Sequence, residues 1–237
     1  HAVRHFMLSA EEWEIVLLSL KVSVAGVGLM LPLAFALAWL LARVRFPGKV
    51  LVDALIHLPL VVPPVVTGWL LLIAFGGNGP IGSWLDRAFG ITLMFRWTGA
   101  ALAAAIMALP LMVRAMRLSL EAVDTRLENA ARTLGAGPWR AFLTITFPLS
   151  LPGILAGAVL GFARSIGEFG ATITFVSNIP GETRTLPLAI YSALQMPDGD
   201  AMVARLAGIS VALSLVALVA SELLARRFGT RGGGHVL

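Results

Sequence analysis

The sequence contains no cysteine and little charge. Of its 237 residues, 13% are Asp, Glu, Lys or Arg, whereas soluble domains carry roughly 25%. The absence of cysteine excludes disulfides and thiolate metal sites. The histidines are scattered without the spacing of a metal site, at His1, His5, His57 and His235. We therefore expect no metal site and no catalytic centre built on one.

Hydrophobic residues take the place of the missing charges. They make up 58% of the chain, and the mean hydropathy is +0.87. Because a helix of about 20 residues crosses the hydrocarbon layer, uncharged runs of about that length indicate membrane spans. Five such runs occur, at 22–42, 58–75, 98–113, 141–163 and 206–221. These are too many for the core of one soluble domain, so the sequence predicts an integral membrane protein.

The predicted fold is all-α, with five transmembrane helices at about 13–42, 50–75, 98–116, 148–176 and 202–225. They form a single transmembrane domain over 13–225, between an N-terminal extension at 1–12 and a tail at 226–237. Residues 1–6 precede Met7, and we set them aside as a non-native remnant or an alternative start. An amphipathic fragment at 81–89 lies in the polar segment after the second helix.

Positive charges are unevenly shared between the two sides of the predicted bundle. The side of the C-terminus holds 11 of them: Arg43, Arg45, Lys49, Arg114, Arg117, Arg126, Arg132, Arg140, Arg226, Arg227 and Arg231. The other side holds 5: Arg4, Arg87, Arg96, Arg184 and Arg205. Since cytoplasmic loops are enriched in Lys and Arg, the C-terminus is predicted inside and the N-terminus outside. Nucleic acid is not needed to explain the pI near 10.9, because no basic run with interleaved aromatics is present.

The longest break in the apolar pattern lies at about 121–142 and includes the run ENAARTLGAG. Asp124 is a suitable N-cap, Gly135 stands where a helix would end in a left-handed residue, and Pro138 suits the first turn of another helix. One apolar stripe at helical spacing consists of Val123, Leu127, Ala130 or Ala131, and Leu134. A short helix, a tight turn and a returning helix are predicted. These residues leave open whether the helix docks on a soluble partner, lies on lipid headgroups or packs on the protein's own spans.

The loop resembles the cytoplasmic loop of ABC importer permeases. That family's pattern is E-A-A, three residues, G, nine residues and I-x-L-P, and here it reads Asn129-Ala130-Ala131, Gly135 and Ile145-Thr146-Phe147-Pro148. Asn129 replaces Glu and Phe147 replaces Leu, while Glu128 keeps a carboxylate one residue earlier. The resemblance implies a coupling helix that inserts into a separate ATP-hydrolysing subunit. It assigns that contact to Glu128, Asn129, Ala130, Ala131 and Gly135.

The sequence has no phosphate-binding loop of the form G-x-x-x-x-G-K-[ST]. Gly48-Lys49 is followed by Val50 and lacks the upstream glycine. Together with the resemblance, this predicts a membrane subunit that is not an enzyme and binds no cofactor. ATP and Mg²⁺ would be bound by the partner ATPase subunit.

A closer resemblance, to molybdate ABC transporter permeases, covers nearly the whole chain. It is carried by FPGK (46–49), HLPLVVPPVVTG (57–68), ARTLGAGPWR (131–140) and ARSIGEFGATITFVSNIPGETRT (163–185). It implies a type I importer of the bacterial inner membrane, with two copies of the permease, two ATP-binding cassette subunits on the cytoplasmic side and a periplasmic molybdate-binding protein. The implied substrate is molybdate, and also tungstate. The alternative is the related sulfate and thiosulfate permeases, which match SNIPGETRT less well.

Two charged residues interrupt the fourth predicted span. Arg164 and Glu168 are four residues apart and would share one helix face. Because each charge would cost about 2.5–3.5 kcal/mol at the bilayer centre on insertion scales, both should face protein or water. They either line or gate a pathway, or form a salt bridge that fixes the helix. Nearby hydroxyls that a passing oxyanion could meet are those of Thr172, Thr174 and Ser177.

Prolines interrupt the second predicted span at Pro63 and Pro64. Proline removes a backbone donor and favours a kink, and the freed carbonyls need partners in a bundle or a water-lined cavity. A broken helix at the pathway and a static kink both remain open.

Two other classes of membrane protein fit the sequence less well. An ion-driven carrier is disfavoured because no internal repeat is visible and only one charge pair lies within the membrane. An intramembrane enzyme is disfavoured because the chain has no H-E-x-x-H, no paired intramembrane aspartates and no Ser/His arrangement.

Overall fold

The first long apolar run forms one continuous helix in the computed structural model, which describes residues 8–229. Helix α1 (Ala10–Arg43) has 34 residues, and at 1.5 Å per residue it is about 50 Å long. A capping box starts it: the Ser9 N–H donates to the Glu12 carboxylate at 2.7 Å, and the Glu12 N–H donates to Ser9 Oγ at 3.2 Å. The helix therefore begins three residues before the predicted bound at 13 and ends close to the predicted bound at 42.

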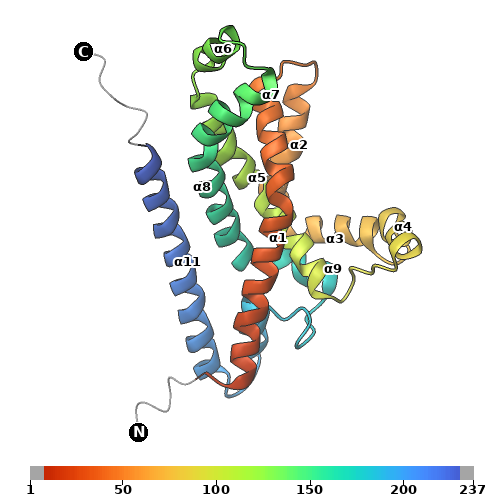
Figure 1. The fold of residues 1–237 in the computed structure, drawn as a ribbon. Coiled ribbons are helices and arrows are strands. Elements are labelled where there is room, and N and C mark those ends of the chain that lie inside the picture. Colours follow the sequence, from red (N-terminus) through yellow and green to blue (C-terminus); the bar gives the residue numbers. More distant parts are fainter. Residues whose placement is uncertain (1–7, 230–237) are drawn as a thin grey trace.

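The second span is broken rather than kinked. Helices α2 (Lys49–Val61) and α3 (Pro64–Phe75) meet at an angle of 115°. Pro63 takes an extended backbone with ψ 134°, because the ring of Pro64 disfavours the helical conformation for the residue before it. Figure 1 shows α3 leading away from the bundle to the amphipathic helix α4 (Pro80–Phe89), the fragment predicted at 81–89.

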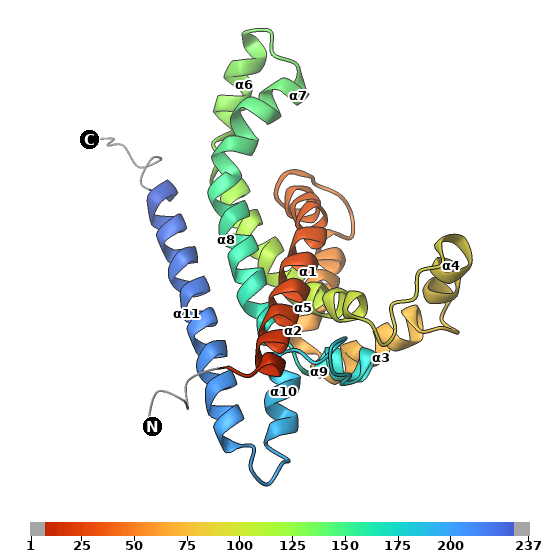
Figure 2. The same ribbon diagram turned by 60° about the horizontal axis from the view of Figure 1, so that its bottom comes forward.

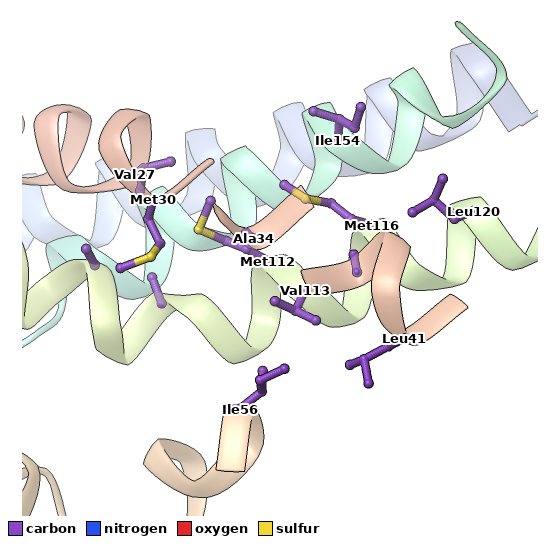
Figure 3. Packing of buried hydrophobic residues seen from close by; sticks show 13 residues of the cluster. Val27, Met30, Ala34, Leu41, Ile56, Met112, Val113, Met116, Leu120 and Ile154 are labelled. Atoms are coloured by element: carbon purple, nitrogen blue, oxygen red, sulfur yellow. The ribbon is translucent and has the colours of Figure 1, made fainter. Parts of the chain in front are cut away.

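The central element is α5 (Trp97–Ala122), which packs between α1 and α8 (Phe147–Ile166). Figure 3 shows Met112 and Met116 of α5 pointing toward α1 and α8, with Ala34 and Leu41 nearby. Helices α5 and α8 approach each other closely because α8 has glycines on the face that contacts α5. A methyl group at Gly153 would overlap the Ser119 side chain. Small residues at such contacts are typical of membrane bundles, where van der Waals packing holds the helices together.

The loop between α5 and α8 follows the predicted order of helix, turn and helix. It contains α6 (Thr125–Thr133), α7 (Pro138–Ala141) and a π-helix (Phe142–Thr146) that runs directly into α8. In Figure 1, α6 lies at the end of the bundle where α1 finishes, and α11 (Asp200–Gly229) also ends on that side. This arrangement agrees with the side of the membrane predicted for the loop and the C-terminus.

The prediction of one helix over 148–176 is wrong. The span ends at Ile166, and after Gly167–Phe169 a separate short helix, α9 (Gly170–Val176), begins. The polar stretch 177–200 also holds a helix that was not predicted, α10 (Leu186–Ala193). Within residues 8–229, four helices are long and apolar enough to cross a membrane, or five when the broken pair α2 and α3 counts as one span.

Helix α11 lies at the edge of the bundle. Figures 1 and 2 both show it beside α8, and Figure 2 shows α10 next to its N-terminal end. Only 11% of its most hydrophobic stretch is buried. The predicted tail at 226–237 begins inside α11, and its residues from 230 on lie outside the described part of the chain.

Candidate functional site

The turn after α6 is a complete Schellman motif, which fixes the shape of the loop. Asp124 caps the start of the helix by accepting from the Arg126 N–H at 2.8 Å. At the other end, the Ala136 N–H donates to the Ala131 carbonyl and the Gly135 N–H donates to the Arg132 carbonyl, each at 3.0 Å. Gly135 has φ +90°, a left-handed conformation that glycine adopts without steric cost. The predictions for both ends of the helix are confirmed.

The surface of α6 is open, and none of its residues is buried. Asn129, Ala130 and Gly135 are exposed, and Ala131 is half-buried. The predicted apolar stripe packs inside the chain only at its first member. Its first member, Val123, ends α5 and is buried, whereas Leu134 is 88% exposed. The outer face of the loop therefore offers small and apolar side chains to whatever covers it.

Glu128 is partly buried by other elements of the chain, whereas its neighbour Asn129 is exposed. Its Oε1 lies 3.2 Å from Nη2 of Arg43, the last residue of α1. The same oxygen accepts a short hydrogen bond from the hydroxyl of Thr146, in the π-helix. The resemblance implies that this carboxylate contacts the ATPase, but here it contacts residues of its own chain.

The breaks in the two bent spans lie against each other. Gly170, the first residue of α9, faces Pro64 so closely that a Cβ there would lie 2.8 Å from the Pro64 ring. One turn further along α3, a Cβ at Gly68 would lie 2.6 Å from the Ala171 carbonyl oxygen and 2.8 Å from the Thr174 side chain. Helices α3 and α9 are therefore in backbone contact. Pro64 lies at that junction, and Pro63 is the residue just before it at the break.

Arg164 and Glu168 form an ion pair of 2.7 Å across the break between α8 and α9. They do not share one helix, as was predicted, because α8 ends at Ile166. Glu168 is 3% exposed, and its Oε1 accepts from the Ala171 N–H at 2.9 Å, which satisfies a backbone donor in the first turn of α9. The carboxylate therefore joins the cation on α8 to the start of α9.

The three candidate hydroxyls have different surroundings. Thr172 is buried, and the Thr174 hydroxyl donates to the Gly170 carbonyl at 2.8 Å within its own helix. Ser177 is exposed and has φ +64° and ψ −167°, a conformation that is costly for a residue with a side chain. Its carbonyl accepts from the Thr183 hydroxyl at 2.9 Å, which ties the loop after α9 together. Of the three residues, Ser177 is the one that is exposed in this chain.

No group of three or more His, Asp or Glu side chains within residues 8–229 is placed to hold a metal ion.

Comparison with known proteins decides the family. Residues 30–230 match the family described as the binding-protein-dependent transport system inner membrane component. The chain belongs to this family of permeases. It is 60% identical over 227 residues to the molybdenum transport system permease protein ModB of Escherichia coli strain K12, covering 96% of this chain and 99% of that protein. It is 41% identical over 199 residues to the sulfate transport system permease protein CysT of the same strain, covering 84% of this chain and 71% of that protein.

Solved structures of bacterial importers share the fold of the permease. One belongs to an ABC transporter involved in the import of the acidic polysaccharide alginate, with a TM-score of 0.71 and 19% identity over 95% of this chain and 82% of that chain. Another is the MetNI methionine ABC transporter in an inward-facing conformation, with a TM-score of 0.65 and 16% identity over 93% of this chain and 99% of that chain. The predicted all-helical permease architecture is confirmed at this level.

Family membership places the permease in the inner membrane as a multi-pass component of a transport system. A binding-protein-dependent ABC system also contains an ATPase and a periplasmic binding protein, so the permease transports and does not itself hydrolyse ATP. The predicted family, location and role are thereby confirmed.

Two polar contacts of the permease were missed from the sequence. Arg43 was counted only as a cytoplasmic cation, yet it pairs with Glu128 across 85 residues of chain. Arg205 of α11 pairs with the nearly buried Glu12 of α1 at 2.7 Å. No local spacing indicates either pair. The partners lie on different helices far apart in the sequence, so the sequence alone carries no signal for them.

Proposed function

We propose that the permease is the membrane subunit of an ATP-driven importer of molybdate, and also of tungstate. One observation carries the proposal: 60% identity to a molybdenum permease extends over 96% of this chain and 99% of that protein. A 58% identity to the molybdenum permease of Haemophilus influenzae supports it, covering 92% of this chain and 96% of that protein. The sulfate permease match is lower in identity and shorter in extent.

The proposed transmembrane arrangement has five crossings, with α2 and α3 forming one broken span. The N-terminus lies outside and the C-terminus inside, because the larger share of Lys and Arg then falls on the cytoplasmic side. Helix α6 then faces the cytoplasm as the coupling helix. Its open surface, with exposed Asn129, Ala130 and Gly135, supports a soluble partner there.

In the proposed assembly, two copies of the permease stand side by side above two ATPase subunits, and a periplasmic molybdate-binding protein docks from outside. ATP and Mg²⁺ bind to the ATPase subunits, and this chain holds neither. Closure of the ATPases on ATP moves each α6 and shifts the pair of permeases between outward-open and inward-open states. Each ligand biases this equilibrium only by its different affinity for the two states.

The proposed pathway runs past the junction of α3 and α9. Pro63 and Pro64 form its bend, the Arg164–Glu168 pair holds the start of α9, and Ser177 stands at the open end. Thr172 and Thr174 lie on the same short helix and would meet the anion only when α9 moves. Neutral hydroxyls suit transport, because a cage of cations would hold a dianion too tightly to release it.

The test is uptake of molybdate by cells that lack their own molybdate and sulfate importers. The cells express this chain with its neighbouring ATPase and binding protein, and excess sulfate is added as competitor. Uptake that needs all three proteins and resists sulfate is expected. Uptake abolished by sulfate would assign the chain to sulfate import, and uptake without the ATPase would contradict an ABC importer altogether.

A further inference from the structure

The carboxylate of Glu128 is positioned to act inside the permease. Its side chain is 29% exposed and lies 3.2 Å from Arg43, while the next residue, Asn129, faces outward. A residue that contacts a docked subunit would be expected on the outer face of α6. Glu128 therefore joins α6 to the membrane domain beneath it.

Arg43 connects this carboxylate to two other elements. It is the last residue of α1, and its side chain is 15% exposed. Its Nη2 also donates to the carbonyl of Val123, the residue that ends α5, at 3.3 Å. In the described part of the chain Glu128 is the one carboxylate paired with Arg43, and the buried Nε of Arg43 has no hydrogen-bond partner there.

Thr146 completes the link on the side of α8. It is 1% exposed and lies at the end of the π-helix that continues directly into α8. Its hydroxyl donates to Glu128. Because Thr146 is buried, it cannot contact a soluble subunit, so any effect of this hydroxyl on ATP hydrolysis must pass through the permease.

The link is needed because α6 has little else to hold it. None of its residues is buried, and it packs mainly on α7 and the π-helix. Charge-assisted hydrogen bonds are directional and about twice as strong as neutral ones, so a partly buried pair can fix the orientation of a helix that lacks a core. Arg43, Glu128 and Thr146 together bring the ends of α1, α5 and α8 to one point on α6.

We propose that Arg43, Glu128 and Thr146 are positioning residues that pass the displacement of α6 on to α1, α5 and α8. Glu128 then works by holding α6 to the spans and not by touching the ATPase. This inference rests on the proposed function, because it needs an ATPase that moves α6.

The first test compares T146V, which removes the hydroxyl at nearly constant volume, with T146S, which keeps it. Each variant is purified with the ATPase in lipid nanodiscs, and ATP hydrolysis is measured with and without the molybdate-loaded binding protein. We expect T146V to lose about tenfold in stimulation, within the factor of about 5–150 that coupling between sites usually spans. T146S should keep the stimulation of the wild type. Equal stimulation in T146V and T146S would overturn the proposal.

The second test is a double-mutant cycle of R43Q, E128Q and R43Q/E128Q, with the same readouts. Each single variant leaves a partly buried charge without its partner, so the double variant should be stimulated more than either single one. E222Q is the matched control, because Glu222 forms an exposed i,i+4 pair with Arg226 on α11, and it should match the wild type. Independent effects of the two single variants would contradict the link, and so would loss of the ATPase from purified E128Q.

The proposed function and the positioning link can be contradicted separately. A wild-type complex that the molybdate-loaded binding protein does not stimulate would contradict the proposed function. A stimulated wild type with unaffected T146V would contradict only the positioning link.

Discussion

At the scale of single residues, the turn of the coupling loop depends on the backbone conformation of Gly135. Its φ of +90° is open to glycine, whereas side chains there cost roughly 1–2 kcal/mol and more when branched at Cβ. A Cβ at this position meets no other atom within 4 Å, so the cost is one of backbone conformation alone. We expect Gly135→Val to uncouple ATP hydrolysis from molybdate uptake while insertion and pairing survive.

Gly135→Asn is the control for this prediction, because asparagine tolerates the left-handed region better than other residues with side chains. It should retain most of the uptake per ATP hydrolysed. Normal transport by Gly135→Val would show that the turn does not need its observed shape.

The Arg164–Glu168 pair should respond unequally to loss of its two partners. Arg164→Gln leaves a carboxylate that is 3% exposed without its cation, whereas Glu168→Gln leaves a cation that is 26% exposed and keeps an oxygen for the Ala171 N–H. Removing one partner of a buried pair costs about 3–5 kcal/mol, and the partial exposure of Arg164 reduces this. We expect Arg164→Gln to lower the thermal unfolding temperature of the purified permease more than Glu168→Gln.

Uptake then separates the two roles of this pair. Loss of transport with a stable, assembled complex would favour a pathway role, and loss of assembly would favour a structural one. Equal unfolding temperatures for both variants would contradict the asymmetry.

Residues that act through their neighbours in sequence were predictable, and residues that act across the fold were not. Asp124, Gly135 and Pro138 follow local rules for helix ends, and the structure confirms each of them. The partner of Glu128 lies 85 residues earlier, and no pattern in one sequence indicates such a pair.

At the scale of helices, the contact between α5 and α8 depends on the small size of Gly153. A methyl group there would overlap Ser119 and approach the Ala115 carbonyl at 3.0 Å. Overpacking of this kind costs about 1–3 kcal/mol. We expect Gly153→Ala to lower the unfolding temperature of the purified permease, whereas Gly208→Ala on α11, where a Cβ meets nothing within 4 Å, should not. Equal temperatures would mean that the two helices can separate without loss.

Hydropathy predicted where the spans lie but not where they break. The first break coincides with two adjacent prolines, so a bend was expected there, although its angle of 115° exceeds a kink. The second break has no proline. It forms where Glu168 satisfies a backbone donor of α9 and pairs with Arg164, and that requires the buried junction with α3. The sequence marks the place only by Arg164, Glu168 and the glycines beside them, which are equally compatible with a continuous helix that carries an ion pair.

At the scale of the whole molecule, the absence of cysteine makes orientation directly measurable. Asn129→Cys on α6 and Glu182→Cys between α9 and α10 each introduce a single exposed thiol. With a membrane-impermeant maleimide, we expect intact spheroplasts to label Glu182→Cys and inverted vesicles to label Asn129→Cys. The opposite pattern would reverse the proposed topology, and labelling of both variants from one side would contradict the number of crossings.

The isolation of α11 has a consequence for the lipid around the importer. This helix has 30 residues and is about 45 Å long, more than the ~30 Å of hydrocarbon it crosses. It packs on α8 and α10, and the Arg205–Glu12 pair ties its N-terminal part to α1. Because little of its most hydrophobic stretch is buried, we expect the bilayer to influence its tilt, since a long span tilts further as the bilayer becomes thinner. We therefore expect acyl chain length to affect the transport cycle, because α11 packs on α8, the span that leads from the coupling loop to the Arg164–Glu168 pair.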